Sequence, residues 1–205
     1  MSPRPYRLGR RQEAADATHE RIVAAARDVL MGDEGVAGFT VDVVAQRAGV
    51  ARMTVYHQFG SKRSLLEAVL DSFAEAGGLA LMPEVLRRPD PVDALAAFVT
   101  TLAHFYDSAR PVFRRFRGLA AIDPELGEAL KMRQERRRAG VRALVGRLGE
   151  RAGGLPADEL IDVLFTLTSF DSFDVLAGPG RSLREVAPTV QRAALALAGA
   201  NEALS

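Results

Sequence analysis

Apolar residues recur at helical spacing along almost the whole chain, and this pattern excludes most fold classes. They return every three or four positions, as at Ile22, Ala26 and Leu30, and no segment alternates strictly as a half-buried strand does. Glycine and proline separate the helical segments. We therefore predict an all-α fold, with a three-helix N-terminal bundle followed by a larger C-terminal helical domain.

Composition and spacing also exclude several classes of protein. No apolar run approaches the roughly 20 residues that span a bilayer, no apolar secretory segment opens the chain, and there is no cysteine. We expect a cytoplasmic protein without disulfides, metal, cofactor or membrane contact. The three histidines are far apart in sequence, and no glycine-rich phosphate loop is present, so we expect no catalytic residues and no enzyme activity.

The distribution of charge, and the glycines and prolines between helical segments, divide the chain into three parts. Residues 1–65 hold ten Lys or Arg against seven Asp or Glu, whereas the remainder holds seventeen against nineteen. A basic end on a near-neutral body is a weak indication of nucleic-acid binding. We predict a basic flexible arm over 1–17, a first domain with a connecting fourth helix over 18–76, and a second domain over 77–205.

Two short helices joined by a glycine turn lie in the first domain. Thr40 is a suitable N-cap for a helix that continues to Ala48, and Gly49 suits the left-handed turn after it. A second helix follows from Ala51 to about Phe59, and Ser61 can cap the next. This spacing is typical of a helix-turn-helix, although a helical hairpin within a small bundle would show the same pattern.

The outward face of the second short helix carries side chains that suit DNA. Arg52 can donate to guanine, and Met53 or the Thr54 methyl group can contact a thymine methyl. Tyr56, His57 and Thr40 are suitable donors to phosphate. A helix of about nine residues is roughly 13 Å long, which fits a major groove about 12 Å wide.

These residues resemble the DNA-binding domain of the TetR family of bacterial regulators. The resemblance rests on Phe39-Thr40-Val41, Val44-Ala45, Ala48-Gly49-Val50, Thr54-Val55-Tyr56, Phe59-Gly60-Ser61-Lys62 and Leu65-Leu66. It covers about residues 18–70, and the rest of the chain matches only in length and helical layout. It implies a homodimeric transcription regulator, most often a repressor, that binds a pseudo-palindromic operator in double-stranded DNA and is released by a small molecule.

The resemblance also implies roles for particular residues. The base-contacting positions fall on Arg52, Met53, Thr54 and His57, and the phosphate-contacting positions on Thr40, Tyr56 and Lys62. Lys62 begins the fourth helix, whose macrodipole adds to its attraction for phosphate. The sequence departs from the family at Ala51, where serine is common, so we expect no helix cap and no phosphate contact there.

Other charged and aromatic residues leave two interpretations open. The arginines before Glu13 are either an arm that follows DNA or a solvated tail. The basic residues between Lys131 and Arg142 are either a second nucleic-acid patch or, for most of them, a solvated helix face. Seven residues are candidates for an effector pocket, for a structural network or for the core: Phe105, Phe116, Arg133, Arg137, Phe170, Asp171 and Asp174.

The last two helices are the predicted dimer interface, because alanines lie beside leucines there and permit close packing across a two-fold axis. A buried monomeric core would give the same pattern. Two rival functions also remain: a small-molecule-binding or catalytic helical protein, and a non-specific DNA binder. The near-neutral second domain argues against the latter.

Overall fold

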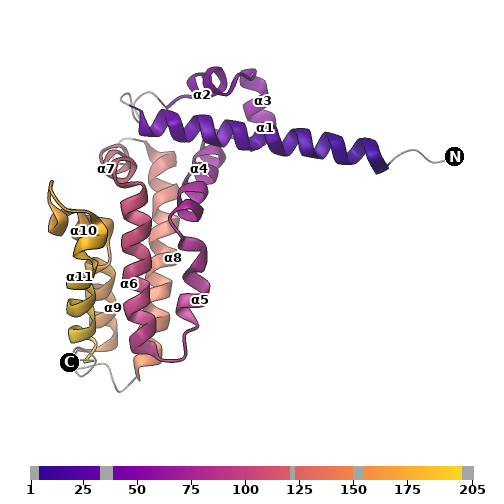
Figure 1. The fold of residues 1–205 in the computed structure, drawn as a ribbon. Coiled ribbons are helices and arrows are strands. Elements are labelled where there is room, and N and C mark those ends of the chain that lie inside the picture. The colour runs from indigo at the N-terminus through magenta and orange to yellow at the C-terminus, as the bar shows by residue number, and fades with distance from the viewer. Residues whose placement is uncertain (1–4, 33–38, 121–122, 150–154, 200–205) are drawn as a thin grey trace. The chain divides into compact units, whose positions relative to one another are not determined.

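The computed structural model describes residues 5–32, 39–120, 123–149 and 155–199 (Figure 1). All regular elements in these ranges are helices, which confirms the predicted all-α fold. Contacts divide the described residues into two compact units. The first contains the residues up to Ser72 together with 114–129, and the second contains 73–113 together with the residues from Leu130 onward.

The first unit is built on four helices of the N-terminal third of the chain: α1 (Pro5–Met31), α2 (Val41–Ala48), α3 (Arg52–Phe59) and α4 (Lys62–Ala76). Helices α1, α2 and α4 turn an apolar face inward, because most of their large apolar residues share one side. The side chains of Ile22, Leu30, Val44, Leu65 and Leu66 are almost completely buried.

Helix α1 begins earlier than the sequence suggests. We expect an arm before Thr18, whereas α1 continues back to Pro5 in one helix of 27 residues. The intervening residues are mostly good helix formers such as Arg, Gln, Glu and Ala, and proline is well tolerated at a helix start. Charge alone therefore does not indicate an irregular arm here.

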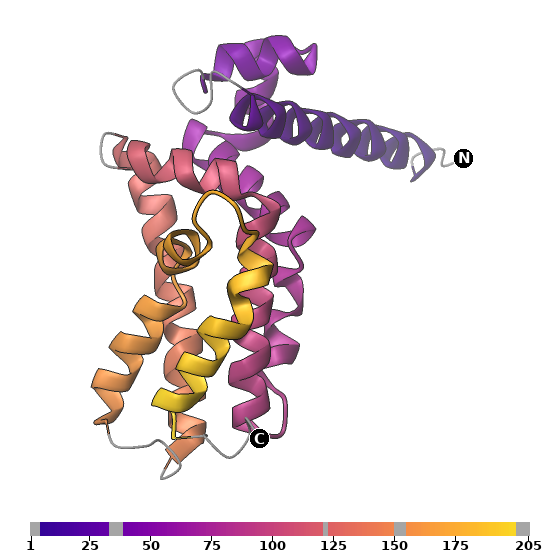
Figure 2. The ribbon, with the colours of Figure 1, turned by 60° about the vertical axis from the view of Figure 1, so that its left-hand side comes forward.

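The second unit surrounds α6 (Pro91–Ser108), which packs along α11 (Leu183–Leu197) and α5 (Met82–Leu86). The remaining elements are η1 (Leu79–Leu81), α7 (Arg110–Leu119), α8 (Pro124–Leu148), α9 (Ala157–Leu167) and α10 (Phe170–Ala177). In Figure 2, α6, α8, α9 and α11 lie side by side, and residues from all four helices form one apolar core. Helices α4, α7 and α8 each begin in one unit and end in the other. No helix in the described part of the chain is long and apolar enough to cross a membrane.

The first of the last two helical segments is not the single helix that the sequence predicts. The first breaks after Thr168, where the Ser169 hydroxyl accepts a hydrogen bond from Ser172 N and starts α10. The second is continuous although Pro188 lies inside it. Pro188 is exposed, so water can bond the carbonyl that proline leaves without its amide partner.

The apolar stripe that we assigned to a dimer interface lies in the core of the protomer, as the alternative interpretation allowed. Leu160, Leu164, Val190 and Ala194 each have a relative exposure of 0%. They pack against the other helices of the second unit, because the same small and branched residues that suit a dimer contact also suit a helix–helix contact within one chain. Large apolar side chains that remain exposed on α9 and α10 are Val163, Val175 and Leu176.

Candidate nucleic-acid interface

Helices α2 and α3 form a helix-turn-helix within the first unit. The Thr40 hydroxyl accepts from Val43 N at 3.2 Å and caps α2. Gly49 ends α2 with φ 64° and ψ 37°, and its N–H bonds the carbonyls of Ala45 and Gln46. This left-handed conformation is one that glycine adopts without a steric penalty, so the predicted turn is confirmed.

Helix α3 begins without a side-chain cap, as expected from alanine at position 51. Its buried residue is Val55, with Phe59 partly buried, and the imidazole of His19 stacks on the Phe59 ring with centroids 4.4 Å apart. The Gln58 amide donates to the carbonyl of Ala15 at 3.5 Å. These contacts fix α3 against α1, and they could not be read from the sequence because they join residues about 40 positions apart.

The face of α3 opposite Val55 is exposed. The side chains of Arg52, Met53 and His57 are exposed, and those of Thr54 and Tyr56 are half-buried. The Met53 side chain is 61% exposed, an unusual position for a large apolar group. We name Arg52, Met53, Thr54 and His57 together the base-contact face. It offers a cation, a hydroxyl, an imidazole and apolar tips, the groups that hydrogen-bond or pack against base edges.

Arg52 does not extend freely from this face. Its Nη1 donates to both carboxylate oxygens of Asp42, at 3.1 and 2.9 Å, and its Nη2 to the Tyr56 hydroxyl at 3.4 Å. Its guanidinium carbon also lies 5.6 Å from the centroid of the Tyr56 ring. The hydrogen bond to Tyr56, followed by the charge of Asp42, raises the pKa of Arg52 above its usual value. Arg52 therefore stays charged, and its guanidinium is oriented before DNA arrives.

Lys62, the predicted phosphate contact at the start of α4, also has an acidic partner. Its ammonium donates to Asp123 at 2.9 Å, and both side chains are partly buried. The other carboxylate oxygen of Asp123 accepts from Leu126 N and so caps the start of α8. Asp42 and Asp123 were not anticipated from the sequence, because neither lies at the three- or four-residue spacing that indicates an ion pair within a helix.

The structure therefore brings the seven predicted DNA-contacting residues together in one unit. Thr40 precedes α2, Lys62 begins α4, and the other five lie on α3. Hydroxyl and ammonium groups that can donate to phosphate therefore lie in the same unit as the base-contact face.

The seven candidate effector-binding residues do not all lie together. Phe116 belongs to the first unit and is buried. The other six belong to the second unit: Phe105, Arg133, Arg137, Phe170, Asp171 and Asp174. Phe105 and Phe170 are buried in an aromatic cluster with Tyr106, Phe113 and Phe173, whose neighbouring ring centroids are 5.1 to 5.9 Å apart.

Arg137 and Asp174 each contact residues that are distant in the sequence. The guanidinium carbon of Arg137 lies 3.9 Å from the centroid of the Phe165 ring. Its Nη1 donates to the Phe165 carbonyl and to Thr168 Oγ1. Burial lowers its pKa from the usual arginine value. Asp174 accepts from Arg110 Nε at 2.7 Å, and the same guanidinium bonds the carbonyls of Gly178 and Arg181. Arg110 was missed in the sequence because nothing near it in the chain marks these distant acceptors.

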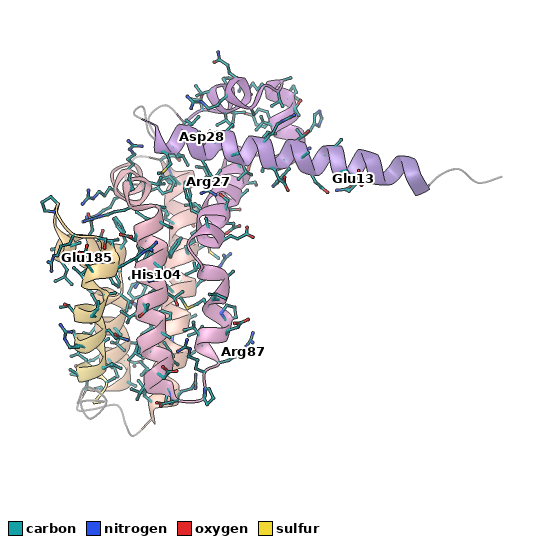
Figure 3. The ribbon with its side chains drawn as sticks, in the orientation of Figure 1. Glu13, Arg27, Asp28, Arg87, His104 and Glu185 are labelled. Atoms are coloured by element: carbon teal, nitrogen blue, oxygen red, sulfur yellow. The ribbon has the colours of Figure 1, made fainter. Side chains whose placement is uncertain are left out.

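No cluster of three or more potential metal ligands occurs among the residues that the structure describes. The exposed position of His104 on α6 agrees with the surface position that its place off the apolar stripe predicts (Figure 3).

Comparison with known proteins places this geometry among transcription regulators. The model of the family described as "Bacterial regulatory proteins, tetR family" matches residues 22–69. YdeS of Bacillus subtilis, an HTH-type transcriptional regulator, is 30% identical over 122 residues, which cover 58% of this chain and 57% of YdeS. The first curated relatives are matched over only 30 to 57% of their own length.

Solved structures match almost the full chain. A transcriptional regulator of Rhodococcus sp. RHA1 is 27% identical, with a TM-score of 0.64 over 88% of this chain and 97% of its own. A transcriptional regulator of Saccharomonospora viridis, solved in complex with choline, is 17% identical, with a TM-score of 0.65 over 85% of this chain and 94% of its own. The second likeness shows the fold alone.

Proposed function

Because the chain belongs to the TetR family of bacterial regulatory proteins, we propose that it controls transcription as a homodimer that binds a pseudo-palindromic operator. We propose further that it is a repressor that a small molecule releases from DNA.

The observation that carries this proposal is the exposed base-contact face on a helix that is fixed at both ends. The turn at Gly49 and the contacts of Gln58 and His19 hold α3, while Arg52, Met53 and His57 remain accessible. Rigid placement matters, since base contacts discriminate only when donors and acceptors meet at hydrogen-bond distance. Thr40, Tyr56 and Lys62 serve as the phosphate contacts in this proposal.

A dimer is proposed because one α3 helix contacts too few bases for useful specificity. Two copies with centres about 34–36 Å apart would occupy successive major grooves. The exposed apolar residues Val163, Val175 and Leu176 support an interface on the α9–α10 side of the last two helical segments.

An effector site in the second unit is proposed around the aromatic cluster and Asp171. Tyr106 in this cluster is buried, which raises the pKa of its hydroxyl, and Arg137 and Asp171 both interact electrostatically with it. Aromatic rings beside a carboxylate suit a cationic or amphipathic molecule, and the Saccharomonospora viridis relative of this fold was solved with choline. Phe105, Phe170, Arg133, Arg137 and Asp174 remain candidate contacts, although the partners of Arg137 and Asp174 also fit a structural role. Phe116 belongs to the first unit and is not part of this proposal.

Selection from a pool of random duplexes tests the proposal. The protein should enrich a pseudo-palindrome whose half-sites are separated by about one helical turn. A pool that shows no enriched sequence after repeated selection, although the protein retains it on a filter, would contradict sequence-specific binding and favour the non-specific alternative.

A further inference from the structure

Asp42 is the charged residue near the base-contact face that the proposed function leaves without a role. It lies in the first turn of α2, ten positions before Arg52 on α3, and its side chain is 62% exposed. A carboxylate there is unexpected on a DNA-binding surface, because it repels phosphate. Its contact with Arg52 explains its presence only in part, since an exposed ion pair contributes little to folding stability.

The geometry of the contact divides the donors of Arg52 into two groups. Asp42 engages only Nη1, which donates to both of its oxygens. A guanidinium has two edges with parallel N–H donors, Nη1–Nη2 and Nε–Nη2. On the Nε–Nη2 edge, Nη2 makes a long hydrogen bond of 3.4 Å to the Tyr56 hydroxyl. Asp42 and Tyr56 therefore engage different terminal nitrogens of the guanidinium, and only the long bond to Tyr56 must give way before the Nε–Nη2 edge can make bidentate contacts.

We infer that Asp42 is a positioning residue that makes Arg52 discriminate between sequences. This inference rests on the proposed function. Against a guanine, Arg52 can keep Asp42 on Nη1 and donate from its other edge to O6 and N7. A phosphate out of reach of the guanidinium as Asp42 holds it can be contacted only if Arg52 leaves Asp42, which brings a bare carboxylate close to the DNA backbone. Asp42 therefore weakens non-specific contacts more than specific ones.

The Asp42→Asn substitution tests this, because it removes the charge and keeps the shape. The duplex is the best one recovered by selection with the wild-type protein, and its reference is the same duplex with shuffled bases. The affinity for the selected duplex divided by that for the shuffled duplex should fall about two- to fivefold. The main reason is that the variant binds the shuffled duplex more tightly. Binding is measured at low salt, so that weakened variants remain measurable.

Two controls separate positioning from bulk charge. Asp28→Asn removes the same charge from the same unit, at an exposed position of α1 (Figure 3), and should leave the ratio unchanged. In an Arg52→Gln background, Asp42→Asn should also leave the ratio unchanged, because Asp42 acts through Arg52. The circular dichroism spectrum and the thermal midpoint of each variant verify that the fold is retained.

Each outcome decides the inference. A ratio that Asp42→Asn leaves unchanged, or that falls equally in the Arg52→Gln background or with Asp28→Asn, overturns it and leaves the proposed function intact. A wild-type protein with no preferred duplex overturns the proposed function, and the inference with it.

Discussion

At the scale of single residues, the site depends on polar side chains that are exposed yet held in place. Arg52 is 56% exposed, yet its guanidinium contacts two other side chains. Thr40 is also exposed, and its hydroxyl is committed to capping α2. Because an ordered side chain loses less entropy on binding, such contacts would favour the proposed DNA binding without burying any of the proposed contact groups.

Gly49 is the residue on which the turn depends most. We predict that Gly49→Ala lowers the free energy of unfolding by roughly 1–2 kcal/mol, because φ 64° is unfavourable for a residue with a Cβ atom. Urea unfolding monitored by circular dichroism measures it. Gly146→Ala is the matched control: this glycine lies inside α8 with open space around a Cβ, so alanine should stabilise the protein slightly. Equal effects at both positions would show that the left-handed turn is unimportant.

At the scale of elements, the short helices were predictable and the long-range contacts were not. Thr40, Gly49 and Ser61 mark helix ends through local chemistry, and the structure has α2, α3 and α4 beginning or ending beside them. The break after Thr168 was missed because no glycine or proline marks it. The partners of Arg52 and Lys62 were missed because an ion pair between helices depends on the fold, and sequence spacing carries no record of it.

The ion pair between Lys62 and Asp123 should limit how strongly α4 binds phosphate. We predict that Asp123→Asn raises affinity about two- to fivefold for the selected and the shuffled duplex alike, because the Lys62 ammonium becomes available to any phosphate. Asparagine preserves the cap on α8. Fluorescence anisotropy at several salt concentrations measures the affinity. The slope of log affinity against log salt concentration should steepen by up to about 0.9. An increase for one duplex only would contradict the assignment of Lys62 to phosphate.

At the scale of the whole molecule, two copies must pair before the base-contact faces can span successive grooves. Val175 on α10 is 76% exposed, and we expect it to be covered in the dimer. Val175→Asp should raise the dimer dissociation constant at least about tenfold, because each copy then buries an unpaired carboxylate. Sedimentation velocity at several concentrations measures it.

His104→Asp is the matched control for that substitution, because it adds the same group at an exposed position of α6 in the same unit (Figure 3). It should leave the sedimentation profile unchanged. If the wild-type protein sediments as a monomer at every concentration, or Val175→Asp has no effect, the interface does not lie on this surface.

The central claim is that α3 contacts base edges, and binding of the selected and shuffled duplexes by a variant of the base-contact face tests it most directly. Replacing Arg52 and His57 together by alanine should weaken binding to the selected duplex at least about tenfold, since each bidentate base contact contributes roughly 1–3 kcal/mol. Binding to the shuffled duplex should change less than about threefold, because Thr40, Tyr56 and Lys62 remain. An equal loss for both duplexes, or no loss for either, would contradict the claim.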